Sequence, residues 1–135
     1  MVPQATTEAM PTLSSGDLAS DMWESSHAAW LGRWSAMVEA TDVASDIVRY
    51  DGQFEVQPAG LICSVLWTFN DERLASVSLR PQEGRVALDL LLVRFGIDLS
   101  MLVPAGDGLF SIEMGGTRFE VDRLDGVVSL HEVCA

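Results

Sequence analysis

Acidic residues at helical spacing are the most prominent candidates for chemistry in this chain. Asp17, Asp21 and Glu24 recur at four- and three-residue intervals. Asp42 and Asp46 repeat the four-residue interval further on. On a helix, such intervals place side chains on one face. Two interpretations remain open: a solvated face that keeps a small protein in solution, or a surface that binds a basic partner through complementary charge.

Metal binding is not predicted. Glu24 and His27 have the Glu-x-x-His spacing of carboxylate-bridged di-metal bundles, but those sites need two such pairs and two further glutamates. His131 lies beside Glu132 in a run that we interpret as a strand, and it fits a partly exposed histidine better than a base. No serine, cysteine or lysine stands in a context typical of an activated nucleophile. The sequence therefore predicts no metal and no cofactor, and it favours a protein that is not an enzyme without deciding the point.

Asp89 is the best candidate for a carboxylate with a perturbed pKa. It interrupts residues 86–93, a run that is apolar on both sides and that we interpret as a strand buried at the centre of a sheet. A buried acid without a partner has a raised pKa, and such groups gather at functional sites. The alternatives are that Asp89 pairs with an arginine such as Arg85 or Arg73, or that it is wet at a sheet edge.

Three tryptophans fall within twelve positions. Trp30 and Trp34 belong to an apolar stripe at three- and four-residue spacing, which predicts a largely helical region from about Asp17 to Tyr50, capped near Ser15. The tryptophans are then core residues. The alternative is that Trp23, which lies outside the main stripe, anchors a contact with a partner.

Alternating apolar and polar residues in 61–69 and 73–80, followed by the apolar run 86–93, predict an antiparallel meander. Gly115-Gly116 predicts a further hairpin near the end of the chain. The predicted fold class is α+β, an N-terminal helical region packed on a mainly antiparallel, meander-type sheet of about seven strands. Residues 1–15 are predicted to be a flexible tail, and residues 16–135 a single domain.

The charge balance limits the partners. The chain has 135 residues and a net charge of −12, and all eight of its basic residues are arginines. Such charge opposes binding to nucleic acid and to anionic membranes. Genome bias is the favoured explanation for the lack of lysine. Cys63 and Cys134 are too few and too far apart for a disulfide framework, and neither a signal peptide nor an apolar run of about 20 residues is visible, so a cytoplasmic location is predicted.

These features favour a small acidic, cytoplasmic protein-binding module that engages a basic surface on another protein. Bacterial or phage proteins of this kind include secretion chaperones, immunity proteins and inhibitors. The predicted order of a helix followed by a short meander resembles the class I type III secretion chaperones, although those end in a helix and this chain ends in strands. The alternative function is a small-molecule binder or enzyme with a pocket between the helix and a curved sheet, which Trp67 would line. A homodimer is predicted because a small sheet leaves edges that need cover.

Overall fold

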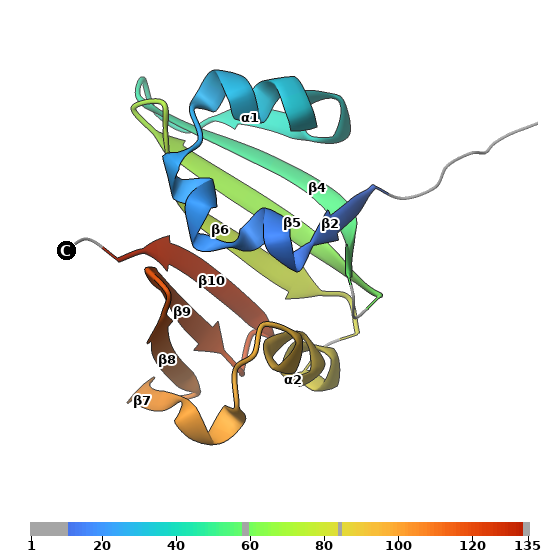
Figure 1. Ribbon diagram of the computed structural model, residues 1–135, viewed down its shortest axis with the longest axis vertical. Helices are drawn as coiled ribbons and strands as arrows, with labels where there is room; N and C mark the ends of the chain where they lie inside the picture. Colours follow the sequence, from blue (N-terminus) through green and yellow to red (C-terminus); the bar gives the residue numbers. More distant parts are fainter. Residues whose placement is uncertain (1–10, 58–59, 84, 134–135) are drawn as a thin grey trace, which may run out of the picture.

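One mixed sheet forms the body of the protein (Figure 1). The structure is a computed structural model that describes residues 11–57, 60–83 and 85–133. Its nine strands are β2 (Thr12–Ser14), β3 (Glu39–Asp42), β4 (Ile47–Gln57), β5 (Leu61–Asn70), β6 (Arg73–Pro81), β7 (Val103–Gly106), β8 (Leu109–Met114), β9 (Thr117–Asp122) and β10 (Val127–Glu132). They lie in the order β2-β4-β5-β6-β10-β9-β8-β7, and β3 also pairs with β4. All the pairings are antiparallel except that of β2 with β4.

The helical elements are short and cover one face of this sheet (Figure 1). They are η1 (Ser15–Leu18), η2 (Ser20–Glu24), α1 (His27–Trp34), η3 (Ser35–Met37), α2 (Arg85–Arg94) and η4 (Leu99–Met101). Alternate residues of the strands point toward them. In β5, Cys63, Val65, Trp67 and Phe69 are buried, while Ile62 and Ser64 on either side of Cys63 are exposed. The period of two therefore assigns the covered face of the sheet, as the sequence predicted.

Aromatic side chains fill the space between α1 and the sheet. Trp30 contacts Trp67 and Phe69 edge-on, with ring centroids 5.2 and 5.1 Å apart. Trp34 stacks on Trp67 at 6.1 Å and meets Phe54 edge-on at 5.6 Å. Each of these side chains is almost fully buried. Because edge-to-face pairs add about 0.5–1.5 kcal/mol each beyond area burial, this cluster holds α1 on the sheet.

The predicted fold class is wrong in its N-terminal part. The structure is 51% strand and 25% helical. The region from Asp17 to Tyr50, predicted to be largely helical, contains 3-10 turns, the eight residues of α1, strand β3 and the start of β4. Two local signals break the helix. Ser26 caps α1, its Oγ accepting a hydrogen bond from the Ala29 amide at 3.1 Å. Beyond Met37 the chain is extended in β3 and β4, where Ile47, Val48 and Tyr50 are of types that favour strands.

Residues 85–94 form helix α2 and not the predicted central strand. Ala87, Leu88, Leu91 and Leu92 are buried, whereas Leu90 and Val93 are 52% and 57% exposed. This pattern is a helical stripe, and leucine, alanine and arginine are good helix formers. The next strand along the chain, β7, does not pair with β6. Strand β10 pairs with β6 instead, so the meander ends at β6. The described residues form nine strands in a mixed sheet, where about seven in a meander were predicted.

At two sites the conformation of the backbone requires glycine. Gly115 and Gly116 form the two-residue turn between β8 and β9 with φ values of 58° and 87°, which confirms the predicted hairpin. Gly52 lies in β4 where the chain passes over it after η3. A Cβ there would lie 2.7 Å from the carbonyl oxygen of Met37, so only glycine allows this close approach.

The remaining sequence expectations have mixed outcomes. Of the predicted tail, residues 1–10 lie outside the described residues, while Thr12–Ser14 form strand β2 instead of a flexible segment. Cys63 is buried, and burial raises the pKa of its thiol to about 11, so it packs as a small apolar group. Cys134 lies outside the described residues. Within the described part of the chain, no helix is long and apolar enough to cross a membrane.

Candidate functional site

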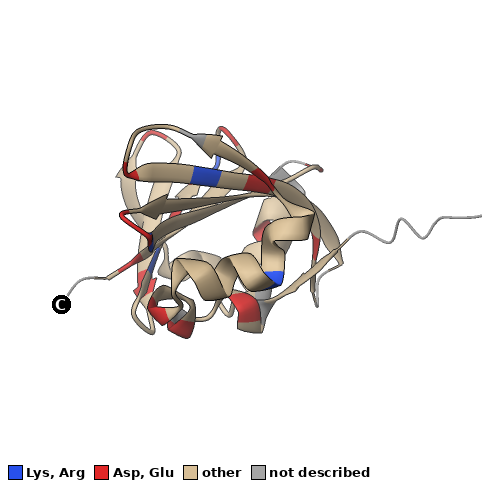
Figure 2. Cartoon of the chain, turned by 90° about the horizontal axis from the view of Figure 1, so that it is seen from above, with Lys and Arg blue, Asp and Glu red and all other residues tan. Residues whose placement is uncertain are grey.

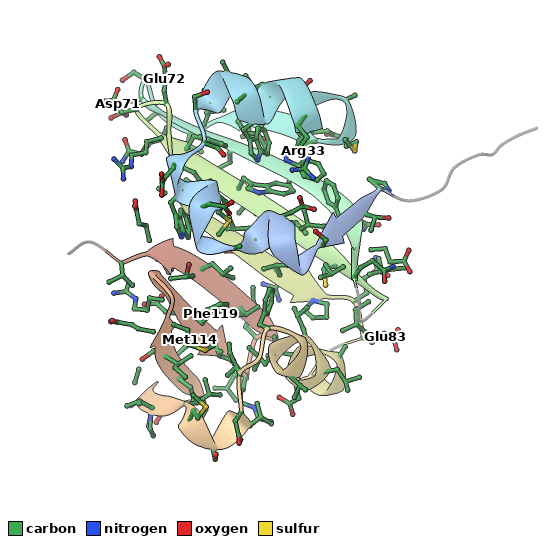
Figure 3. All side chains as sticks on the ribbon, viewed as in Figure 1. Arg33, Asp71, Glu72, Glu83, Met114 and Phe119 are labelled. Carbon is green, nitrogen blue, oxygen red and sulfur yellow. The ribbon has the colours of Figure 1, made fainter. Side chains whose placement is uncertain are left out.

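The best candidate site is an acidic pocket where two turns of the sheet meet the start of α1. The turn between β3 and β4 contributes Asp46, and the turn between β5 and β6 contributes Asp71 and Glu72. Its volume is about 370 Å³, and His27 and Tyr50 also line it. Figure 3 shows Asp71 and Glu72 at the end of the molecule next to α1, and Glu83 at the opposite end. We call this site the acidic pocket.

Backbone contacts fix the two turns against each other. The Asp71 amide donates to the carbonyl oxygen of Asp46 at 2.7 Å. The amides of Val43 and Ala44 both donate to the Ile47 carbonyl oxygen, at 3.0 and 3.2 Å, which closes the β3–β4 turn. The carboxylates of Asp46 and Asp71 are therefore carried by turns that are hydrogen-bonded to each other and to the sheet.

The inner wall of the acidic pocket is an aromatic contact. His27 Nε2 and Tyr50 Oη are hydrogen-bonded at 2.7 Å. The His27 ring also stacks on Phe69 with 4.5 Å between centroids. His27 is half-buried and Tyr50 is buried. The histidine of the Glu-x-x-His pair thus serves to pack the start of α1 on the sheet, and Ser26 next to it caps that helix.

The carboxylates of the acidic pocket form no ion pair within the described residues. Among the described side chains, five arginines form ion pairs elsewhere: Arg33–Asp17, Arg73–Glu132, Arg80–Asp125, Arg118–Glu120 and Arg123–Asp89. No ion pair of the described residues includes Asp46, Asp71 or Glu72, and all three are exposed. Acidic positions occur on both layers of the fold, with few basic positions between them (Figure 2). The acidic pocket therefore presents uncompensated negative charge.

The turn that carries two of these carboxylates is strained. Asp71 and Glu72 have φ values of 56° and 66°, in the left-handed region that glycine and asparagine favour. A two-residue hairpin with both central residues at positive φ is a type I′ turn, for which Asn-Gly is the preferred sequence. Aspartate tolerates this conformation better than glutamate does. The chain thus keeps a carboxylate at a position where glycine would be less strained.

The predicted acidic helix face does not exist as one surface. Asp17 lies in η1, and Asp21 and Glu24 lie in η2, so they are not on one helix. Asp17 accepts hydrogen bonds from the amide and hydroxyl of Ser14 and pairs with Arg33, with only 12% of its side chain exposed. Its role is to cap η1 and to connect η1 with α1, so it is not part of a solvated face. Asp21 and Glu24 are exposed.

The second predicted acidic pair is also divided. Asp42 ends strand β3, and its side chain lies outside the described residues. Asp46 lies four residues later in the β3–β4 turn and reaches the acidic pocket. The helical spacing that suggested both residues was a coincidence of a strand followed by a turn. Asp71 and Glu72 were missed because the sequence identified them only as a connector between two strands.

Trp23 and Asp89 have structural partners. Trp23 is 3% exposed, and its Nε1 donates to Thr117 Oγ1 at 3.0 Å, so it connects η2 to the start of β9 and presents no surface to a partner. Asp89 lies on α2 with its side chain 31% exposed, and it accepts a hydrogen bond from Arg123 at 2.9 Å. It is neither on a strand nor fully buried. The predicted alternative of a pair with an arginine is confirmed, although with Arg123 in place of Arg85 or Arg73.

A larger hollow is a groove of about 990 Å³ on the uncovered face of the sheet. Its lining is mixed, and Ser78 and Ser129 there are hydrogen-bonded to each other at 3.1 Å. Arg80 forms part of its wall and binds both carboxylate oxygens of Asp125, at 3.1 and 2.8 Å. This contact lowers the pKa of Asp125. The polar groups named here satisfy one another, so size alone does not make this groove the functional site.

Similarity to known proteins gives no functional information. No family model, curated protein or solved structure matches the chain significantly. Within the described residues, no three histidine, cysteine, aspartate or glutamate side chains are arranged to hold a metal ion. The element order that resembled secretion chaperones is not retained, because the described residues begin with strand β2 and two 3-10 turns instead of a long helix. The function must therefore be argued from the side chains themselves.

Proposed function

We propose that the protein is an acidic binding module that engages a basic surface on another protein. The observation that carries this proposal is the acidic pocket, where Asp46, Asp71 and Glu72 converge without a basic partner among the described residues. A guanidinium or ammonium group would supply the missing charge. The net charge of −12 supports the same class of partner, because it speeds the approach of cationic proteins and opposes nucleic acid.

The geometry favours recognition by arginine or lysine side chains on a folded or extended partner. The backbone hydrogen bond from the Asp71 amide to the Asp46 carbonyl oxygen fixes the two turns relative to each other. The backbone of the turns therefore needs no ordering on binding, which lowers the entropic cost of association. Asp21 and Glu24 are also exposed, and they lie close to His27 in the sequence. We therefore extend the proposal to a partner whose basic surface is broader than the acidic pocket. Chaperone-, immunity- and inhibitor-like roles, in the cytoplasm of a bacterium or encoded by a phage, all fit this chemistry.

The test uses an arginine-rich octapeptide as the probe and isothermal calorimetry as the readout. We expect binding that weakens by about tenfold or more between 50 and 300 mM salt, because it depends on several charges at the surface. Glu72→Gln and Asp46→Asn should each weaken it about two- to fivefold, as exposed charge pairs do. Glu83→Gln removes the same charge at the opposite end of the molecule and is the matched control (Figure 3).

Two results would contradict the proposal. An affinity that does not change with salt would show that charge is not the basis of recognition. An equal loss in Glu83→Gln and Glu72→Gln would show that the peptide responds only to the total charge and that the acidic pocket is not a site.

The predicted homodimer stays a prediction. The outer strands of the sheet are β2 and β7, with β3 beside β2 on the same side of β4. β7 carries Pro104, which cannot donate a hydrogen bond to an added strand, so we propose the β2/β3 edge as the dimer contact. Sedimentation at micromolar concentration measures the outcome, and a monomer there would refute it.

A further inference from the structure

Three aspartates of this chain are followed directly by glycine: Asp51, Asp107 and Asp125. In such a pair the backbone nitrogen of the glycine can attack the side-chain carboxyl carbon of the aspartate, because glycine has no Cβ to hinder the approach. The product is a five-membered succinimide ring. Water opens this ring at either carbonyl, which gives back aspartate or leaves isoaspartate, whose backbone runs through the side chain.

Hydrogen bonding, and not exposure, distinguishes the three pairs. All three aspartates are exposed. Ring closure requires a glycine N–H that is free to react and a carboxyl group that is free to turn and to take up a proton, because a carboxylate anion is a poor electrophile. A hydrogen bond to either group must first break, and each such bond slows the reaction by about two- to tenfold.

The Asp51–Gly52 pair is protected by the sheet. Gly52 lies in the middle of β4, opposite Val65 of β5. Further along β4, the Glu55 amide donates away from β5, to the carbonyl oxygen of Pro11 at 2.9 Å. Amides along a strand point alternately to its two sides, so the Gly52 amide, three residues earlier, points to β5. Ring closure here would break the pairing of two central strands.

The Asp125–Gly126 pair is bound at both of its reacting groups. Arg80 donates to the two carboxylate oxygens of Asp125 at 3.1 and 2.8 Å. These bonds lower the pKa of Asp125, so the neutral carboxyl that cyclises is less populated. The Gly126 amide donates to the carbonyl oxygen of Asp122 at 2.8 Å. Several hydrogen bonds must therefore be lost before this pair reacts.

The Asp107–Gly108 pair has neither restraint. It forms the two-residue turn between β7 and β8, at the edge of the sheet (Figure 1). Within the described residues, no hydrogen bond involves the Asp107 carboxylate or the Gly108 amide, and Asp107 forms no ion pair. The turn also requires its glycine, because φ is 71° and a Cβ at Gly108 would lie 2.5 Å from Leu124 Cγ.

We propose that Asp107 is a site of spontaneous isoaspartate formation, through attack by the Gly108 nitrogen, and that the fold protects Asp51 and Asp125. The new C–N bond replaces the C–OH bond of the carboxyl group, and the hydroxyl leaves with the amide proton as water. Hydrolysis of the ring consumes one water molecule. Because β7 pairs only with β8 among the described strands, the lengthened backbone affects only the edge of the sheet. This inference does not rest on the acidic pocket, whose residues are different.

The experiment is incubation of the full chain at neutral pH in water enriched in oxygen-18, followed by trypsin digestion in ordinary water and mass spectrometry. Each passage through the succinimide places one oxygen-18 atom in the residue, and fragment ions locate it. Cleavage after arginine separates the three pairs into peptides 50–73, 95–118 and 124–135. We expect incorporation at Asp107 to be at least about tenfold faster than at Asp51 or Asp125.

Two variants and the unfolded chain connect this difference with the structure. Asp107→Glu keeps the charge but would need a six-membered ring, so incorporation at this position should disappear. Arg80→Gln releases the Asp125 carboxylate and should raise incorporation there by about two- to tenfold, while the Gly126 amide stays bonded. In urea the three rates should become similar, because unfolding removes the hydrogen bonds that protect two of the pairs.

Three outcomes overturn this inference. The first is the absence of incorporation at Asp107. The second is equal or faster incorporation at Asp51 or Asp125 in the folded chain. The third is an excess at Asp107 that stays the same in urea, because the neighbouring sequence and not the fold would then cause it. Binding of the arginine-rich octapeptide is measured separately, so a failure of the proposed function leaves this result unaffected.

Discussion

Replacing Glu72 with glycine should stabilise the fold while weakening the proposed binding. Glu72 occupies the second central position of the type I′ turn between β5 and β6, with φ at 66°. A side chain in this left-handed conformation costs roughly 1–2 kcal/mol relative to the right-handed one. Glycine avoids that cost but loses about 0.5–1 kcal/mol more backbone entropy on folding. The balance predicts a free energy of unfolding that is higher by about 0.5–1 kcal/mol in Glu72→Gly.

Glu72→Gln is the matched control for this prediction. Glutamine keeps the side chain and its strained backbone but removes the charge, so the free energy of unfolding should change by less than about 0.5 kcal/mol. Urea unfolding followed by tryptophan fluorescence measures both variants. The midpoint should rise for Glu72→Gly at an unchanged slope, because a change of slope would indicate an altered denatured state.

The peptide affinities of the two variants distinguish the role of the Glu72 charge from that of the backbone strain. Both variants lose the same carboxylate, so both should bind the arginine-rich octapeptide with the same reduced affinity. If Glu72→Gly is no more stable than Glu72→Gln, the turn does not hold Glu72 in the left-handed region and the reasoning is refuted. If Glu72→Gly alone loses affinity, the geometry of the turn matters more than its charge.

Three further perturbations test the core. Thr117→Val removes the acceptor of Trp23 Nε1 and should lower the free energy of unfolding by about 1–3 kcal/mol in urea, whereas Thr117→Ser should change it less. Leu91→Ala empties a fully buried site on α2 and should lower the same free energy by about 2–5 kcal/mol. Burial raises the pKa of Cys63 from 9.0 to about 11, so between these pH values the unfolded chain loses a proton that the native state keeps. Stability should therefore fall by about 2 kcal/mol as pH rises through that window, and Cys63→Ala should flatten the slope.

The strands could be predicted from the sequence where one face of the sheet is exposed to solvent. β5 and β6 pair in the register that their alternation indicates, with Val65 opposite Leu79 and Trp67 opposite Val77 on the covered face. A shift of one residue would have turned these side chains to solvent, so burial excludes that shift, and the two-residue turn between Asn70 and Arg73 sets the register. The turn at Gly115-Gly116 was equally clear, because two positive φ values in succession are easiest for glycine.

Periodicity could not separate a helix from a strand in residues 85–94. A run that is apolar at nearly every position satisfies both periods, and only its length and its leucine content favour a helix. The same limit applied to the N-terminal region. Trp30 and Trp34 do share a helix face, but the residues on either side of α1 form 3-10 turns and strands whose apolar side chains also reach the core. The secondary structure of these segments depends on tertiary packing, which no local sequence pattern contains.

The acidic pocket depends on contacts that are remote in sequence. Asp46 and Asp71 belong to different hairpins, and one backbone hydrogen bond between them brings the two turns together. Helical spacing identified Asp46 for the wrong reason and could not identify Asp71 or Glu72. The strain of the β5–β6 turn gives the stronger indication, because glycine at Glu72 would relieve it without disturbing any ion pair of the described residues. A carboxylate at a position where it lowers stability suggests a benefit outside folding, and the benefit that we propose for this pocket is the recognition of a cation.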